Sequence, residues 1–133
     1  MINLIFYIMA KIDLVKNWLS SEGYKYDVDS DGDIHFRYQG ANLFFTADES
    51  DPLFFRIIMP NIYELKGDRV KVLEAVNSTC AERKVLKAFI VNDRLWLAIE
   101  ILIDTTPDIE DFFERCCNML VEGRTFIAQK ILG

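Results

Sequence analysis

Alternation of apolar and polar residues along 24–38 restricts this part of the chain to a β-sheet. Two stretches, YKYDVD and DIHFRYQ, carry an aromatic or aliphatic side chain at every second position. A period of two is that of a strand with one buried face, and it does not fit an α-helix. The intervening Ser30-Asp31-Gly32-Asp33 is typical of a tight turn, because Gly and Asp tolerate positive φ angles. We therefore predict a β-hairpin here.

Further apolar stretches extend the predicted sheet. LFFTA follows Asn42 and LFFRIIM precedes Pro60, with the acidic stretch 48–52 between them. The region 24–59 is therefore predicted to be a four-stranded antiparallel meander that ends at Pro60. VLKAFIV and LWLAIEILI predict a second hairpin with Asn92-Asp93 in its turn. Because both are almost continuously apolar, they are expected either to be central strands covered on both faces or to leave one face for a partner.

Three segments repeat apolar residues at helical spacing. They cover 9–21, 67–82 and a segment after Thr106 and Pro107, two residues that suit a helix cap and a first turn. The predicted buried stripes are Ile8, Ile12, Val15 and Leu19 in the first, Val70, Leu73, Val76 and Cys80 in the second, and Ile109, Phe112, Phe113, Cys116 and Leu120 in the third. The order α-ββββ-α-ββ-α predicts an α+β fold, with helices packed on an antiparallel sheet.

The chain has the length and composition of a single domain spanning 1–133. Half of its residues are hydrophobic and ten are Phe, which is enough for a core without disulfides or metals. The apolar start MINLIFYIM is shorter than the ~20 residues that span a bilayer. It also lacks the features of a signal peptide, so no membrane association is expected. Two interpretations stay open: the start extends the first helix, or 1–8 lies upstream of a native start at Met9.

Charge and cysteine content exclude several classes of protein. The net charge is −6 and the fifteen basic residues are scattered, whereas a nucleic-acid-binding protein gathers Lys and Arg against phosphates. No nucleic-acid partner is expected. Three cysteines, two of them adjacent, do not form a disulfide framework, which indicates a reducing, cytoplasmic location. Cys116 is expected to be buried and inert, and Cys117 to be more exposed and open to oxidation.

The stretch DVDSDGDIHFRY resembles a calcium-binding loop. Asp27, Asp29 and Asp31 alternate and Gly32 follows them. An EF-hand also requires a bidentate Glu at the twelfth position and a helix on each side. The twelfth position is Tyr38, and both flanks alternate as strands. We therefore predict an acidic turn and no metal site, with weak adventitious cation binding as the alternative.

No group of residues predicts catalysis. His35 is the only histidine, and in an alternating strand it points away from Ile34 and Phe36, toward solvent. A cysteine nucleophile would need this same histidine as its base. Glycine-rich phosphate loops and paired metal ligands are absent from the sequence. We therefore predict no catalytic, cofactor-binding or metal-binding residues, no cofactor and no enzymatic activity.

Two tryptophans are candidates for an interaction surface. Trp96 begins a very apolar strand, and Trp18, with Leu14, lies beside the main stripe of the first helix. Tryptophan is common both in cores and at interfaces. Trp18, Leu14 and Trp96 are therefore predicted either to be core residues or to mark an interface.

The second half of the chain resembles the YbjN family, whose domains have a type III secretion chaperone-like fold. In that family a helix carrying a Val-Asn pair leads through a short charged link into an apolar hairpin. The matching residues here are Val76-Asn77, Lys84, Lys87, Phe89, Asn92-Asp93 and the run from Leu95 to Ile103, followed by Asp104 and a final helix. The resemblance implies a non-enzymatic regulatory or chaperone-like protein of bacteria and supplies no catalytic residues.

Resemblance and composition together favour a cytoplasmic protein-interaction module. It is expected to bind a protein or peptide partner and to be a homodimer. The alternative is a small-ligand sensor or an unrecognised enzyme, which requires a pocket with converging polar groups.

Overall fold

The structure is a computed structural model that describes residues 2–46, 48, 50–105 and 107–133, and the side chains from residue 11 onward within these ranges. Three helices and six strands follow the predicted order. The elements are α1 (Ile2–Ser21), β1 (Tyr26–Val28), β2 (Ile34–Tyr38), β3 (Ala41–Phe45), β4 (Phe54–Glu64), α2 (Arg69–Glu82), β5 (Leu86–Val91), β6 (Arg94–Leu102) and α3 (Ile109–Leu132). The α+β prediction is confirmed, and the arrangement is compatible with a chaperone-like fold.

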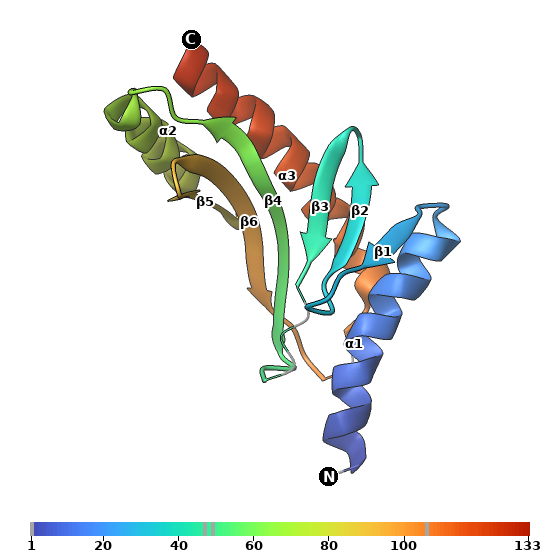
Figure 1. Cartoon of the computed structure of the whole chain (residues 1–133). Helices are drawn as coiled ribbons and strands as arrows, with labels where there is room; N and C mark the ends of the chain where they lie inside the picture. Colours follow the sequence, from blue (N-terminus) through green and yellow to red (C-terminus); the bar gives the residue numbers. More distant parts are fainter. Residues whose placement is uncertain (1, 47, 49, 106) are drawn as a thin grey trace.

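All six strands form one antiparallel sheet in the order β1-β2-β3-β4-β6-β5. The first four strands are the predicted meander, and the β5–β6 hairpin is added next to β4 (Figure 1). Asn92 and Asp93 both have positive φ angles, 49° and 61°, as a two-residue hairpin turn of the primed type requires. The two turn residues therefore favour the antiparallel pairing of β5 with β6.

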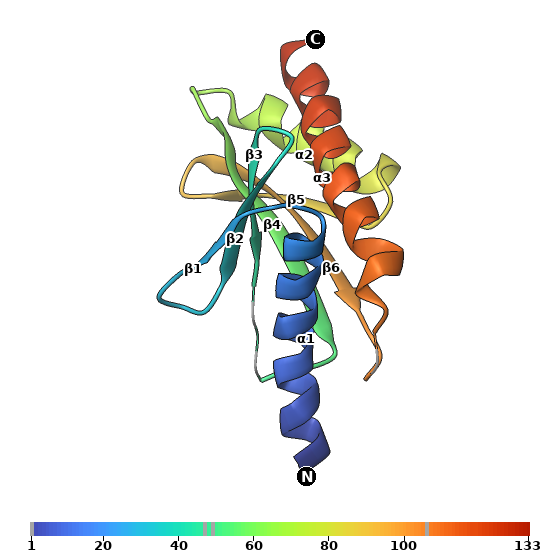
Figure 2. The ribbon, with the colours of Figure 1, turned by 90° about the vertical axis from the view of Figure 1, so that its right-hand side faces the viewer.

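The helices lie on one face of the sheet, and the other face is left open. Figure 2 shows the strands on one side of the molecule and α3 on the other, with α1 running beside them. α3 presents a long buried stripe to the sheet, which includes Phe113, Cys117, Leu120 and Ile127. Phe113 contacts Trp18 of α1 as well as Phe36 and Phe55 of the sheet, so it joins α1, α3 and the sheet in one core.

Strand β4 continues through Pro60, and the prediction that it ends there was wrong. The pairing of β4 with β6 shifts register between Met59 and Tyr63, which is a β-bulge. Asn61 takes a positive φ of 55° inside it. A bulge interrupts the ladder of hydrogen bonds, so the missing N–H of proline costs nothing there.

The predicted buried stripe of the second helix was also wrong. The buried residues of α2 are Val72, Ala75 and Thr79, whereas Val70 is 72% exposed and Leu73 is 48% exposed. Cys80 is exposed too. Both sides of this helix carry apolar residues, so helical spacing alone did not identify the side that meets α3 and β5. Val70 and Leu73 consequently face solvent, whereas Val76, the remaining residue of the predicted stripe, is half-buried against the core.

Strand β5 is an edge strand and not a central one. β6 lies between β4 and β5, so only β6 of the two almost continuously apolar strands is central. The C-terminal part of α2 runs beside the free edge of β5. There the backbone N–H of Ala88 donates to Cys80 Sγ at 3.3 Å. This sulfur occupies a backbone donor that an incoming strand would otherwise use.

The first helix starts earlier than the predicted residue 9. α1 begins at Ile2, so the apolar start continues the first helix, and the stripe residue Ile8 lies outside the described side chains. Thr106, the predicted cap, lies outside the described residues, and α3 begins at Ile109 after Asp108. The predicted stripe of α3 is buried apart from Phe112, which is half-buried against Phe55.

Candidate functional site

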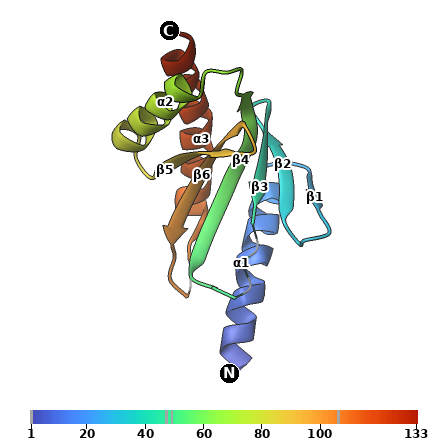
Figure 3. The ribbon, with the colours of Figure 1, turned by 60° about the vertical axis from the view of Figure 1, so that its left-hand side comes forward.

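The open face of the sheet carries aromatic and charged side chains in register. One row of paired residues crosses all six strands, namely Asp27, His35, Phe44, Ile58, Ala98 and Lys87. The neighbouring row, which includes Phe45, Ile57 and Ile99, points into the core. Phe44, Phe54, Phe89 and Trp96 are half-buried and lie on this face by strand alternation. We call this surface the open face. Figure 3 shows that the helices lie on the opposite side of the sheet.

A three-residue ion-pair network lies beside these aromatic residues. Glu100 accepts a 3.0 Å hydrogen bond from Lys87, and its other oxygen is 3.2 Å from Arg56 Nε. The contact between Glu100 and Arg56 Nε is an ion pair, because its geometry does not satisfy a hydrogen bond. One carboxylate thus faces two cations, and Arg37 adds a further exposed cation on β2. The open face is locally positive, although the chain as a whole is acidic.

The three predicted interface residues occupy different environments. Trp96 is half-buried on the open face, where it contacts Phe89 and donates from Nε1 to Asn61 Oδ1 at 3.1 Å. Leu14 is half-buried on α1. Trp18 is 6% exposed, because it packs against Phe113 and Tyr24. Only Trp96 of the three therefore lies on the open face.

The acidic turn between β1 and β2 is organised by its own hydrogen bonds. Asp29 Oδ1 accepts the backbone N–H groups of Asp31 and Asp33, at 2.9 and 3.0 Å. The carboxylates of Asp29, Asp31 and Asp33 each have an oxygen within 4.8 Å of the others. Asp27 lies in β1, outside this group. The geometry is that of an Asx turn, in which a side-chain oxygen replaces a backbone acceptor.

His35 has polar and aromatic neighbours. Its Nε2 lies 2.9 Å from Asn42 Oδ1, its ring stacks on Phe44, and Nδ1 is 3.9 Å from the exposed carboxylate of Asp27. None of these neighbours is a serine, threonine or cysteine, so His35 has no hydroxyl or thiol to activate among them.

Cys117 is completely buried, which corrects the expectation that it is the more exposed of the adjacent pair. Burial raises the pKa of Cys116 to about 11 and raises that of Cys117 further. Both thiols stay protonated at neutral pH and do not act as nucleophiles. Both α1 and the sheet contact α3, so a wide arc of this helix is buried. The adjacent residues Cys116 and Cys117 are therefore both covered.

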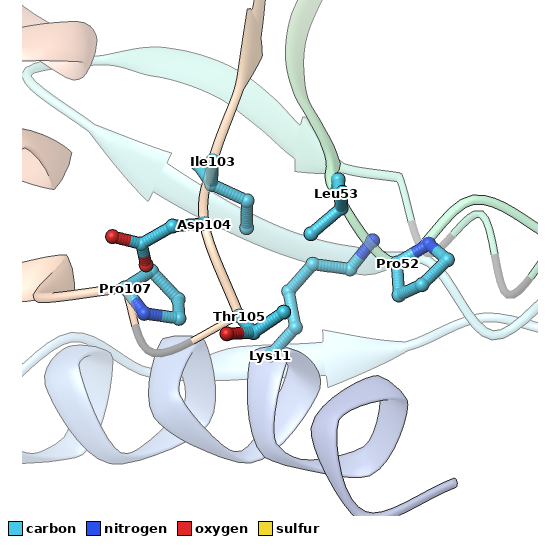
Figure 4. Close-up of a pocket in the computed structure, with 7 residues that line it drawn as sticks. All are labelled: Lys11, Pro52, Leu53, Ile103, Asp104, Thr105 and Pro107. Carbon is cyan, nitrogen blue, oxygen red and sulfur yellow. The ribbon is translucent and has the colours of Figure 1, made fainter. Parts of the chain in front are cut away.

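A small apolar cavity lies between α1 and the two loops at the end of the sheet (Figure 4). It measures about 120 Å³, and its lining is Lys11, Pro52, Leu53, Ile103, Asp104, Thr105 and Pro107. Lys11 is only 2% exposed, and its amine donates to the carbonyl oxygen of Phe54 at 2.9 Å. Burial lowers the pKa of Lys11, and the charges of Asp48 and Asp51 oppose that lowering. Figure 4 shows the amine turned toward Leu53 and Pro52, so it holds the loop and does not face a ligand.

A larger polar cleft lies between the end of α2 and α3. Its volume is about 410 Å³, and its lining is Glu82, Arg83, Lys84, Arg115, Asn118, Met119 and Glu122. The sequence did not predict this cleft, because its lining comes from two segments that only the tertiary fold brings together. Lys84 was named only for the family resemblance. The one available signal was the helical spacing of Arg115, Asn118 and Glu122.

Fold and surfaces together define a class of protein: an α+β domain with one helix-covered sheet face, one open face, and no catalytic constellation among the described residues. The chain belongs to the YbjN family. The family pattern, described as "Putative bacterial sensory transduction regulator", matches residues 11–106. This confirms the resemblance seen in the sequence and supports a regulatory role.

Comparison with solved structures supports the fold. The crystal structure of YbjN, described as "a putative transcription regulator from E. coli", superposes with a TM-score of 0.63. The match covers 88% of this chain and 88% of that chain at 12% sequence identity. At this identity the similarity concerns the fold alone. No curated protein matches the sequence significantly, and no helix among the described residues is long and apolar enough to cross a membrane.

Proposed function

We propose that this protein is a non-catalytic, cytoplasmic regulator that acts by binding a polypeptide on the open face of its sheet. The observation that carries the proposal is the combination of half-buried Phe44, Phe54, Phe89 and Trp96 with no covering helix. Aromatic residues at the centre of a surface patch are the usual anchors of protein interfaces.

The charges beside these anchors define the chemistry of the partner. Arg37, Arg56 and Lys87 outnumber Asp27 and Glu100 on the open face. An acidic segment with apolar side chains complements this surface in both respects. The partner class is therefore a peptide segment that alternates acidic and apolar residues or presents them on one helix face.

The experiment compares captured partners between matched variants. Affinity capture from the native cell, quantified by mass spectrometry, is carried out with the wild type, with Phe44→Ser and with Lys87→Glu. A partner of the open face is expected to fall at least about tenfold with both variants, which corresponds to ~1.4 kcal/mol. Val28→Ser is the control, because Val28 is 49% exposed and its row points to the other face. A partner retained equally by all proteins contradicts the proposal.

The proposal includes a homodimer formed through the outer side of α2. It is supported by the solvent-facing apolar stripe at Val70 and Leu73. Arg69 and Lys71 lie in the first turn of this helix, and Glu82 is its last residue. Two copies in antiparallel contact therefore pair opposite charges around the two-fold axis. Sedimentation equilibrium is expected to give a dimer for the wild type and a monomer for Leu73→Glu, and a wild-type monomer contradicts this part.

A further inference from the structure

Apart from Glu82, the polar cleft between α2 and α3 shares no residue with the two surfaces used above. It is formed by the last residue of α2, the link Arg83–Lys84, and one side of α3. Its volume of about 410 Å³ falls within the range of small-molecule sites. Unlike most such sites its lining is mainly polar, so a ligand that fits it must itself be strongly polar.

The floor of the cleft is built from the protein core. The hydroxyl of Tyr38, a residue only 2% exposed, donates a 2.5 Å hydrogen bond to Asn118 Oδ1. Burial, together with the nearby Cys117, raises the pKa of Tyr38 to about 12, so this hydroxyl keeps its proton at neutral pH. The amide oxygen of Asn118 is thereby committed to the core. The amide nitrogen, with its two hydrogens, is left for the cleft.

Cations surround this amide. Arg115 and Lys84 are exposed at the cleft and form no hydrogen bond or ion pair with another described residue. Arg83 lies 3.4 Å from Glu122 and covers the ring of Phe126, so it is already engaged. Glu82 and Glu122 are the carboxylates of the lining. Three cations against two carboxylates give the cleft a net charge of +1, on a chain of net charge −6.

The link that carries Lys84 is held in a strained conformation. Val85 has a φ of 63°, in the left-handed region that a β-branched residue rarely adopts. Its side chain is 51% exposed, so burial of that side chain does not account for the conformation. Such outliers persist where surrounding structure fixes them, and they concentrate at ligand-binding sites.

We propose that this cleft binds a small molecule through a phosphate group. Arg115 and Lys84 supply charge-assisted hydrogen bonds, and the Asn118 amide supplies a neutral donor between them. A guanidinium, an ammonium and an amide donor match the several acceptor oxygens of a phosphate better than the two oxygens of a carboxylate. The inference does not depend on the proposed polypeptide partner, because it uses no residue of the open face.

The test is an NMR titration of the full chain with inorganic phosphate and, separately, with glycerol phosphate. Glycerol and sodium chloride at matched ionic strength are the controls for the probe. The side-chain amide of Asn118 and the backbone amide of Lys84 are expected to shift with a phosphate probe and to stay unchanged with both controls. A response to inorganic phosphate alone identifies the free ion as the ligand, and a stronger response to glycerol phosphate identifies an ester. No response to either probe, or shifts that map elsewhere, overturns the proposal.

Variants distinguish a specific phosphate site in the cleft from non-specific attraction of phosphate to the positive charges of the protein. Lys84→Gln with Arg115→Gln is expected to weaken binding at least about tenfold, because both charge-assisted contacts are lost. Lys71→Gln with Arg94→Gln changes the net charge equally at sites outside the cleft and is expected to leave binding unchanged. Tyr38→Phe removes the hydroxyl that orients Asn118 and is expected to weaken binding several-fold. Equal weakening by the Lys71/Arg94 control overturns the proposal.

Discussion

The amine of Lys11 and the carbonyl oxygen of Phe54 form a 2.9 Å hydrogen bond that joins α1 to the first residue of β4. Lys11 is almost fully buried there, and its aliphatic stem lines the apolar cavity shown in Figure 4. This contact attaches the N-terminal helix to the strand at the centre of the sheet.

Replacing Lys11 tests this attachment. Lys11→Ala is expected to lower the free energy of unfolding by about 2–3 kcal/mol, because it removes the packed stem and leaves the Phe54 carbonyl without its donor. Lys11→Met keeps most of the stem and is expected to cost less than Lys11→Ala. Urea denaturation measures both, with Lys25→Met as the exposed control. A larger loss for Lys11→Met than for Lys11→Ala would contradict this account.

Stability is expected to fall as the pH rises from about 9 to 11. Burial raises the pKa of Cys116 from 9.0 in the unfolded chain to about 11 in the folded protein. Below pH 9 both states keep the thiol proton; between the two values the unfolded chain releases it and the folded protein does not. Over this range the free energy of unfolding loses at most about 3 kcal/mol through Cys116.

Denaturation curves across this pH range measure the effect. Cys116→Ala is expected to make the alkaline decline shallower without removing it, because burial also raises the pKa of Cys117. Cys80→Ala, which removes an exposed thiol, is expected to keep the wild-type slope. A slope that is unchanged in Cys116→Ala would show that the buried thiol does not control alkaline unfolding.

Gly123 brings α3 into close contact with β5. A Cβ atom at this position would lie 2.3 Å from Leu86 Cδ2, and Leu86 is 6% exposed, so it has little room to move. Gly123→Ala is therefore expected to destabilise by about 1–2 kcal/mol, after the gain of up to ~1 kcal/mol in helix propensity. The double variant Gly123→Ala/Leu86→Val shortens the opposing side chain. Its measured cost is expected to be smaller than the sum of the two single costs.

Val85 offers a stabilising substitution. Glycine adopts a φ of 63° without the steric cost that valine has there. Val85→Gly is expected to raise the free energy of unfolding by about 1 kcal/mol, less the entropy that glycine adds to the unfolded chain. Thermal unfolding checks this, and Val70→Gly, within α2, is expected to have the opposite sign. A lower melting temperature for Val85→Gly would show that the conformation is not strained.

The acidic turn allows a direct comparison of two aspartates. Asp29→Ala removes the acceptor of two backbone N–H groups and is expected to cost about 1 kcal/mol. Asp27→Ala removes an exposed carboxylate from β1 and is expected to be nearly neutral. Calcium at millimolar concentration is expected to leave the melting temperature unchanged. A calcium-dependent rise that disappears in Asp29→Ala would instead show a metal site.

The fold was predictable from sequence because its signals are local. Alternation in 34–38, a turn at Asn92-Asp93 and helical spacing after Ile109 each specify an element without reference to the rest of the chain. Pro60 was misleading because a bulge makes its missing donor harmless, and a bulge depends on the partner strand. The stripe of α2 was misassigned because both of its sides carry apolar residues.

The candidate sites were less predictable than the fold, for a physical reason. The open face requires the register of six strands before Phe44 and Lys87 fall into one row. The polar cleft requires Lys84 and Arg115 to meet from different elements. Trp96 was named as a candidate because a tryptophan is a plausible interface residue by its type alone, whereas a single arginine or lysine is not.

The sulfur of Cys80 that accepts the Ala88 N–H has a consequence for behaviour in concentrated solution. A free strand edge is a template on which further copies can add without limit. At this edge the template is interrupted by a side chain from the protein's own helix. The Cys80 thiol therefore helps to protect this edge against fibre growth. Oxidation of that thiol is expected to remove the protection while leaving the rest of the fold intact.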